Sequence, residues 1–263
     1  MDWGKANRMS RLFGSDGNAF YLAVDHGYFQ GPTTGLASVG KTIEPITEYV
    51  DAVFVPRGSL RGTIPADIEP AIILRVSGGM SIITDDLSNE TVSVSMEEVL
   101  RLNASAVGYS AYVGSSHEHQ TLKGLSKLVD DAARYGIPVM AVTAVGRELG
   151  QKQQTRFLAL ASRICAEAGA DVVKTYYCND FEKVVEGCPV PVVIAGGPKT
   201  DSELEVFEFV HDGMQRGASG VNLGRNIWQN ECPRGMARGL QAVIHEGASP
   251  QEAYDMYRSM KSG

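Results

Sequence analysis

The sequence predicts an α/β protein that folds as a single (β/α)8 TIM barrel with a parallel eight-stranded sheet. Eight short apolar runs begin at intervals of about 20 to 35 residues, the length of one strand-loop-helix-loop unit. Most of these runs are continuously apolar, as is typical of parallel strands that are covered on both faces. The G-x-G-x-x-G fingerprint of an open dinucleotide-binding sheet does not follow the first run. We therefore expect one catalytic domain over residues 1–263.

Each apolar run ends in small or polar residues and is followed by a segment with helical periodicity. The expected strands are residues 19–27, 51–58, 71–78, 105–114, 138–146, 171–177, 191–197 and 220–226. Two connections, 59–70 and 179–190, leave room only for short helices. After the eighth strand, residues 233–246 and 249–260 supply one helix that closes the ring and another that packs on a neighbour.

Two helices between the strands have a clear apolar stripe. In residues 153–170 the expected stripe consists of Phe157, Leu160, Ile164 and Ala168. In the following helix it consists of Leu204, Phe207, Val210 and Met214, with Thr200 and Asp201 as candidate caps.

Composition excludes several classes of protein. The 24 Lys and Arg residues against 31 Asp and Glu residues give a net charge of −7, so the chain lacks the basic face of a nucleic-acid-binding protein. Apolar residues make up 43% of the chain, enough for a large core, but no run approaches the ~18 residues of a membrane span. The N-terminus has no secretory apolar region, and the four cysteines have no CxxC spacing, so we expect a cytoplasmic protein with reduced thiols.

In barrels of this kind the active site lies where the strands end and the following loops begin. The candidate catalytic residues at these positions are Lys174, Asp25 and His26. The candidate substrate- and phosphate-binding residues are Gly196, Gly197, Gly224, Arg225, Arg57, Arg75 and Ser77.

Lys174 is the most informative of these residues, because it interrupts the apolar strand AGADVVKTYY. Desolvation lowers the pKa of a lysine and leaves a free amine, which attacks ketones to form an imine. The alternative is a lysine at the strand end that reaches solvent or pairs with a carboxylate. Asp25 is the expected partner of Lys174 and could hold the lysine or a nearby water as a proton shuttle. The alternative is that Asp25 caps the following loop. His26 follows Asp25 directly, so along a regular strand its side chain would point to the opposite face, unless the turn after the strand redirects it.

The glycines after the last two strands predict a phosphate site. Gly196, Gly197 and Gly224 allow close approach of backbone N–H groups to an anion, and Arg225 adds positive charge. The alternative is that each glycine only makes a turn. A phosphorylated substrate with a ketone group follows from the phosphate site and Lys174 together.

Two other motifs point to different chemistry, and we reject both. GLASVGKT (35–42) matches the P-loop pattern, but the first strand ends near Gly27 instead of running into the first glycine. Lys41 and Thr42 are therefore expected at the start of a helix. His117 and His119 are two residues apart on an expected helix start, where they point to different faces and suit a solvated cap better than a metal. We expect no bound metal or cofactor.

Several strings resemble the DeoC/FbaB aldolase family. They are DHGYFQGPTTGL, LRVSGGMSI, LSNE, EHQ, VVKTYY, GCPVPVVIAGG and GASGVNLGRNI, and they cover nearly the whole chain. VVKTYY marks the wider Schiff-base group, and the first string is most similar to the autoinducer-2 branch, whose members are 3-hydroxy-5-phosphonooxypentane-2,4-dione thiolases.

The resemblance implies that Lys174 forms the imine, that Asp25 is a catalytic carboxylate, and that Gly196, Gly197, Gly224 and Arg225 bind phosphate. It also implies a homo-oligomer, often a decamer of stacked pentamers, in the family. One departure is informative. The fructose-bisphosphate aldolases of the family place an acid/base tyrosine on the fifth strand, where this chain has Thr143 in AVTAVGR, and a threonine is a far weaker acid than a phenol.

The leading hypothesis is therefore a thiolase that cleaves a carbon–carbon bond of a phosphorylated dione and passes the acetyl group to coenzyme A. The alternative is a class I aldolase, or an aldolase-like synthase, that acts on dihydroxyacetone phosphate or fructose 1,6-bisphosphate. A third hypothesis, from another class, is a non-catalytic sugar-phosphate sensor on the same fold.

Overall fold

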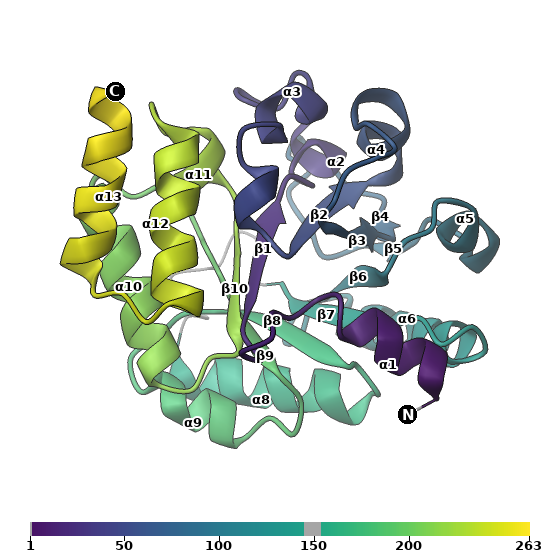
Figure 1. Cartoon of the computed structure of the whole chain (residues 1–263). Coiled ribbons are helices and arrows are strands. Elements are labelled where there is room, and N and C mark those ends of the chain that lie inside the picture. The colour runs from purple at the N-terminus through teal and green to yellow at the C-terminus, as the bar shows by residue number, and fades with distance from the viewer. Residues whose placement is uncertain (1, 145–153) are drawn as a thin grey trace.

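The computed structural model describes residues 2–144 and 154–263. Within these residues, eight parallel strands close into a barrel in the order β1-β10-β9-β8-β7-β6-β3-β2 (Figure 1). The prediction of a (β/α)8 barrel is confirmed. The strands are β1 (Ala19–Ala23), β2 (Ala52–Pro56), β3 (Ala71–Arg75), β6 (Ala106–Ala111), β7 (Val139–Thr143), β8 (Val172–Tyr176), β9 (Val192–Ala195) and β10 (Gly220–Leu223).

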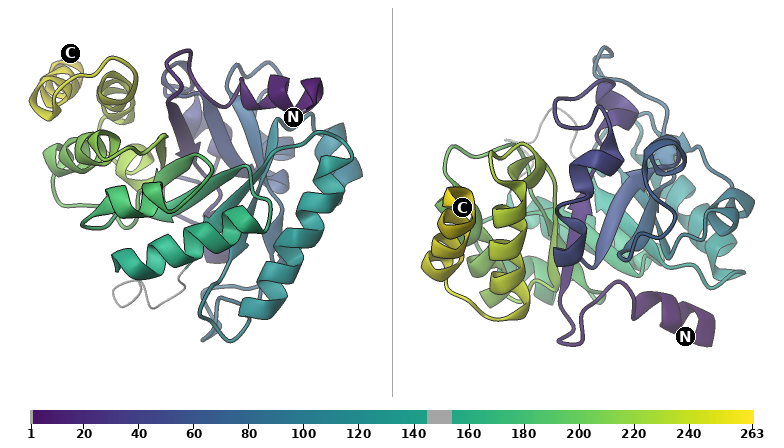
Figure 2. Two further views of the ribbon diagram at one scale, coloured as in Figure 1. Left: turned by 90° about the horizontal axis from the view of Figure 1, so that it is seen from below. Right: turned by 45° about the horizontal axis from the view of Figure 1, so that its top comes forward.

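Helices surround the barrel, and α12 and α13 run side by side at its edge (Figures 1 and 2). The connections expected to be short contain α4 (Arg57–Thr63) and α9 (Phe181–Glu186). The other helical segments are α1 (Trp3–Met9), α2 (Gly27–Gln30), α3 (Val39–Ile43), the 3-10 turn η1 (Thr47–Tyr49), α5 (Met96–Arg101), α6 (Glu118–Ala133), α8 (Thr155–Glu167), α10 (Glu203–Gln215), α11 (Arg225–Trp228), α12 (Pro233–His245) and α13 (Pro250–Ser262). Among the helices of the described part of the chain, none is long and apolar enough to span a membrane.

All eight predicted strands are present, but each ends earlier than expected. The fifth expected strand extends to residue 146, and residues 145–146 lie outside the described part. The third is divided, because β3 ends at Arg75 and Ser77–Gly78 form β4, which pairs with β5 (Thr91–Val92) in a small antiparallel sheet. Two-residue strands have too little alternation to be recognised in a sequence.

Side chains along each strand alternate between two hydrophobic clusters. In β1, Phe20 and Leu22 face the helices, whereas Ala19 and Tyr21 fill the barrel interior. Leu12, which follows α1, is buried in the interior cluster as well. Because the side-chain period of a strand is two, this alternation fixes which residues point inward at the end of each strand.

The buried face of α8 differs from the predicted stripe. Leu160 is 54% exposed, and the buried residues of α8 are Leu158, Ala161, Ser162, Cys165 and Ala166. The buried face is displaced by one residue from the predicted stripe, and it combines Leu158 with four small side chains. In α10, Phe207 and Val210 are buried as predicted, but the N-cap is Ser202 and neither Thr200 nor Asp201 caps the helix.

The P-loop pattern lies in a different structural context from a nucleotide-binding loop. β1 ends at Ala23, well before Gly35, and α3 begins only at Val39. Gly40 has a packing role instead: its N–H donates to the Thr63 hydroxyl at 3.2 Å, and a Cβ on Gly40 would overlap with the Thr63 carbonyl oxygen. The glycine therefore permits close contact between α3 and the end of α4.

We predict that Gly40→Ala lowers the free energy of unfolding by about 1–3 kcal/mol, because the new methyl group meets backbone that has little room to move. Gly58→Ala is the matched control, since its Cβ would have no neighbour within 4 Å, and alanine is favoured over glycine in a helix. Chemical denaturation of both variants measures the difference. Equal stability of the two variants would contradict this role of Gly40.

Candidate active site

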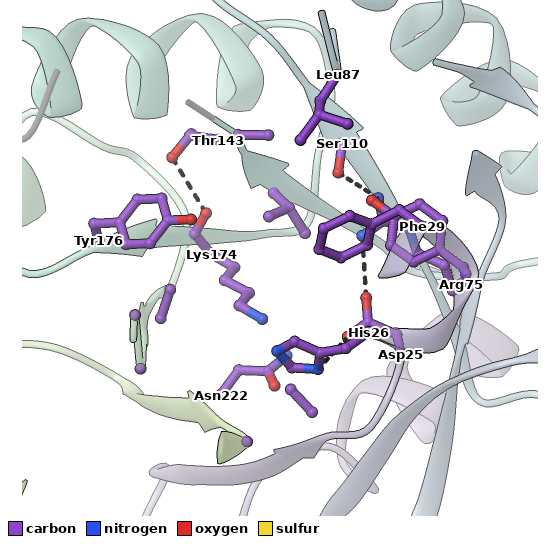
Figure 3. A pocket seen from close by; sticks show the side chains of 18 of the residues that line it. Asp25, His26, Phe29, Arg75, Leu87, Ser110, Thr143, Lys174, Tyr176 and Asn222 are labelled. Atoms are coloured by element: carbon purple, nitrogen blue, oxygen red, sulfur yellow. Dashed lines mark hydrogen bonds and ion pairs between the residues drawn. The ribbon is translucent and has the colours of Figure 1, made fainter. Parts of the chain in front are cut away.

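A cavity of about 180 Å³ opens at the carboxyl ends of the barrel strands (Figure 3). It is lined by residues from nearly every strand of the barrel and from the β4–β5 connection. The polar lining residues are Asp25, His26, Tyr28, Arg75, Glu90, Ser110, Tyr112, Thr143, Lys174, Tyr176, Asn222 and Arg225, together with the backbone of Gly196, Gly197 and Gly224. The cavity therefore lies where the sequence predicted the active site.

Lys174 occupies an inward position of β8, with Val173 on the opposite face of the strand. Its side chain is buried, and its Nζ atom lies 5.3 Å from the centroid of the Phe54 ring. Within the described residues the ammonium group makes no hydrogen bond or ion pair. Burial lowers the pKa of Lys174 to about 8; the carboxylate of Asp25 opposes this shift, and Arg75 and Arg225 reinforce it. A minor fraction of the reactive free amine is therefore present at pH 7, and the free amine becomes the main form above about pH 8.

Asp25 points into the same cavity, because the alternation of β1 continues through Val24. Asp25 makes no ion pair with Lys174 within the described residues, so the alternative of a lysine paired with this carboxylate is not observed there. Instead, Arg75 Nη1 donates to Asp25 Oδ2 at 3.2 Å. The Asp25 carboxylate is thus held by the arginine, and it lines the same cavity as the amine.

Arg75 is the centre of a buried polar network that sequence reasoning did not find. Its Nη2 group donates to Glu90 Oε2 at 3.0 Å and to the Tyr28 hydroxyl. The hydroxyls of Tyr28 and Tyr112 both donate to Glu90 Oε1, at 2.6 Å and 3.1 Å. Glu90 belongs to the string LSNE, directly before β5. Its charged side chain in that string was the feature of the sequence that could have identified it as a site residue. Arg75 is neutralised by two carboxylates and positions Asp25.

Two predicted binding residues do not line the cavity. Arg57 is exposed, because β2 ends at Pro56 and Arg57 already begins α4, which turns its side chain outward. Ser77 lies behind the cavity in β4, where its hydroxyl donates to Glu90 Oε2 at 2.7 Å and accepts from the Ser110 N–H at 3.0 Å. Ser77 therefore supports the Arg75–Glu90 network and has no direct access to a substrate.

His26 does face the cavity, because the chain turns into a helical conformation directly after Asp25. The imidazole packs edge-on against Trp228, with 5.5 Å between the ring centroids. Burial lowers the pKa of His26 to about 4; Asp25 opposes this shift, while Lys174, Arg225 and Arg75 add to it. The ring is therefore neutral at pH 7 and acts as a hydrogen-bonding group at that pH.

The loops after β9 and β10 form the opposite wall of the cavity. Gly197 has a φ of +62°, and a Cβ on Gly196 would lie 2.7 Å from Leu223 Cδ2, so both positions favour glycine. Arg225 Nη2 donates to the Gly197 carbonyl oxygen at 2.8 Å. Asn226, which was not among the predicted binding residues, accepts from the Thr200 N–H at 2.9 Å and joins the two loops.

The threonine on the fifth barrel strand has a structural role. Thr143 donates its hydroxyl hydrogen to Thr175 Oγ1 at 2.8 Å, between β7 and β8. Tyr176, on the same inward face of β8 as Lys174, supplies a phenol to the cavity. Burial raises the pKa of Tyr176, and its hydroxyl makes no hydrogen bond within the described residues, so it is available as a proton donor.

Three residues that line the cavity carry a buried polar atom without a hydrogen-bond partner within the described residues. The atoms are His26 Nδ1, Asn222 Oδ1 and Arg225 Nε. Buried polar atoms without a partner are uncommon in folded proteins and are often satisfied by a ligand. Asn222 was not among the predicted residues. Like Lys174, it is a polar residue inside an apolar strand, GVNLGRN, and this feature could have identified it.

The described residues contain no group of three or more His, Cys, Asp or Glu side chains that could hold a metal ion. His117 precedes α6, and its Nδ1 atom lies 3.2 Å from Asp86 Oδ2, whereas His119 is exposed.

Residues 19–230 match the family model of the DeoC/LacD family aldolases. A 3-hydroxy-5-phosphonooxypentane-2,4-dione thiolase of Yersinia enterocolitica is 47% identical over 259 residues, which cover 98% of this chain and 88% of the relative.

Solved structures agree with this family. An archaeal fructose 1,6-bisphosphate aldolase has a TM-score of 0.82 and 28% identity, covering 92% of this chain and 100% of its own. A second solved structure, of an archaeal fructose-1,6-bisphosphate aldolase with the catalytic lysine covalently bound to the carbinolamine intermediate of the substrate, has a TM-score of 0.81 and 27% identity, covering 91% of this chain and 99% of its own.

We predict that Lys174→Met raises the free energy of unfolding at pH 7 by about 1–3 kcal/mol. Between about pH 8 and the ordinary lysine pKa of 10.5, the unfolded chain binds a proton that folded Lys174 does not. The free energy of unfolding of the wild type therefore rises with pH in this window, and its difference from that of the variant becomes smaller. Denaturation of both proteins at pH 7 and pH 10 measures the difference, and a gap that does not narrow would contradict the depressed pKa.

Proposed function

Because the chain belongs to the DeoC/LacD aldolase family, we propose that it is a Schiff-base enzyme that cleaves a carbon–carbon bond of 3-hydroxy-5-phosphonooxypentane-2,4-dione and transfers the acetyl group to coenzyme A. The observation that carries the proposal is the buried amine of Lys174, unpaired within the described residues and at the mouth of the barrel. The name of the similar Yersinia enterocolitica protein supports the dione as substrate.

The phosphate group of the substrate is assigned to the loops after β9 and β10. Arg225 supplies a buried Nε–H without a hydrogen-bond partner in the described part of the chain, and Gly196 and Gly197 let backbone approach the anion. The arginine on the other side of the cavity, Arg75, is already neutralised by Asp25 and Glu90. Positive charge that is free to meet a phosphate therefore lies on the Arg225 side.

The first steps prepare the bond for cleavage. The Lys174 amine attacks the C4 ketone, the carbinolamine loses water, and a protonated imine remains. The thiol of coenzyme A then adds to the C2 carbonyl, and its proton passes to a base in the cavity. The C2–C3 bond breaks, and its electron pair moves toward the iminium nitrogen and forms an enamine. Acetyl-coenzyme A leaves.

The last steps release the second product. C3 of the enamine takes up a proton, and water hydrolyses the imine to a three-carbon hydroxyketone phosphate and free Lys174. Asp25 is the carboxylate that faces the amine, so we assign the proton transfers to it, with the neutral ring of His26 as a hydrogen-bonding partner. The Tyr176 phenol is a second proton donor at the same cavity.

A class I aldolase acting on dihydroxyacetone phosphate or fructose 1,6-bisphosphate is the second candidate. The archaeal aldolase structures favour it, and it uses the same lysine and phosphate loops. This candidate is weakened because position 143 carries a threonine and not the acid/base tyrosine. The Thr143 hydroxyl is a weak acid, and it donates its hydrogen to Thr175. The homo-oligomer, the decamer and the cytoplasmic location expected from the sequence remain proposals.

We expect sodium borohydride to trap a covalent adduct of the protein with dihydroxyacetone phosphate. Intact-mass measurement should show one adduct per chain, and Lys174→Met should abolish it. With the dione as substrate, product should form only when coenzyme A is present. An adduct that survives Lys174→Met would overturn the Schiff-base assignment, whereas equal turnover without coenzyme A would replace the thiolase by the aldolase. If no substrate gives an adduct, the Schiff-base function is wrong.

We also predict that Arg225→Gln raises KM for the phosphorylated substrate about 10- to 100-fold with a smaller change in kcat, because a charge-assisted contact with the phosphate is lost. Arg57→Gln is the matched control, since Arg57 is exposed and lies outside the cavity. Trapping of unphosphorylated dihydroxyacetone should be equal in both variants. A similar rise in KM in the Arg57 variant would refute the assignment.

A further inference from the structure

Asn222 is a buried amide that the steps above leave without a role. It lies at an inward position of β10, between Val221 and Leu223, which pack on the outer cluster. In the sheet register Asn222 pairs with Ala195 of β9, and Ala195 pairs with Tyr176 of β8. Ala195 therefore lies between Asn222 and Tyr176, while Lys174, two residues earlier on the same inward face of β8, pairs with Val193.

The surroundings of Asn222 satisfy only its nitrogen. Nδ2 donates to the sulfur of Met140 at 3.9 Å, and Oδ1 is buried without a hydrogen-bond partner within the described residues. A buried carbonyl oxygen without a donor is costly, and an apolar residue would pack in a barrel interior without that cost. Asn222 lines the cavity into which the Lys174 amine also points (Figure 3).

A protonated imine on Lys174 carries one N–H group, and a buried N–H requires an acceptor. Asp25 is the charged candidate, but it already accepts a hydrogen bond from Arg75. We propose that the amide oxygen of Asn222 accepts the hydrogen bond from the imine nitrogen of Lys174 and holds it in position during cleavage. This inference rests on the proposed Schiff-base function.

A neutral acceptor suits this position better than a carboxylate. It can accept a hydrogen bond from the imine N–H without adding a negative charge, which would raise the pKa of Lys174 and keep the lysine protonated before the imine forms. The titratable and charged groups that face the amine from the surrounding elements are Asp25, His26, Arg75, Tyr176 and Arg225. Asn222 adds an acceptor to this set and leaves its net charge unchanged.

The test uses two substitutions that shift the same titration in opposite directions. Borohydride trapping with dihydroxyacetone phosphate is measured against pH, and the wild-type rate should rise with a midpoint near pH 8. Asn222→Asp should move the midpoint upward by about one pH unit or more, because a carboxylate stabilises the ammonium form. Asn222→Ala should reduce the trapping rate about tenfold and leave the midpoint unchanged or lower.

Asn7→Asp on the exposed surface of α1 makes the same change of charge far from the cavity and should leave the profile unchanged. If the Asp variant does not fold, the alanine variant alone decides, through its rate. Equal midpoints in wild type and Asn222→Asp, or a wild-type trapping rate in Asn222→Ala, would overturn the role of Asn222. Failure of the wild-type protein to form any adduct would instead overturn the proposed function.

Discussion

The burial of the Lys174 amine without a counter-ion in the described residues is the constraint on which the rest of the site depends. An ammonium group in a barrel interior is costly, and the cost is reduced by releasing the proton. A direct ion pair would remove this effect, because a carboxylate in contact stabilises the charged form. The arrangement around Asp25 avoids that pair, since Arg75 takes the carboxylate oxygen.

The polar groups around the cavity divide into two sides with different tasks. On one side, Arg75, Glu90, Tyr28 and Tyr112 satisfy one another and form a closed, neutralised network that fixes Asp25. On the other side, Arg225 and the glycine loops after β9 and β10 retain an unsatisfied donor. A phosphorylated substrate that spans the cavity would place its anion on the open side and its carbonyl groups near Lys174.

Much of the fold was predictable, because eight continuously apolar runs at regular spacing are typical of parallel strands covered on both faces. The β4–β5 sheet was not, since two-residue strands show no period. The buried face of α8 was predicted incorrectly, because the sequence shows which residues are apolar but not which of them face the strands. Among the site residues, Lys174 and the glycines after the last two strands lie where expected, whereas Arg57 and Ser77 do not line the cavity. The end of a strand cannot be located to one residue from composition, and one residue decides the direction of a side chain.

The sequence by itself determined the barrel, the position of a lysine inside an apolar strand, and the resemblance to a family of Schiff-base enzymes. These properties depend on local patterns, which a single chain displays directly. Only the tertiary structure decided that Arg75 holds Asp25, that Glu90 enters the site, and that Asn222 and Arg225 line the cavity with buried atoms that lack a partner in the described residues. Each of these contacts joins residues far apart in the chain, and their partners are fixed only when the barrel closes and the strand ends meet.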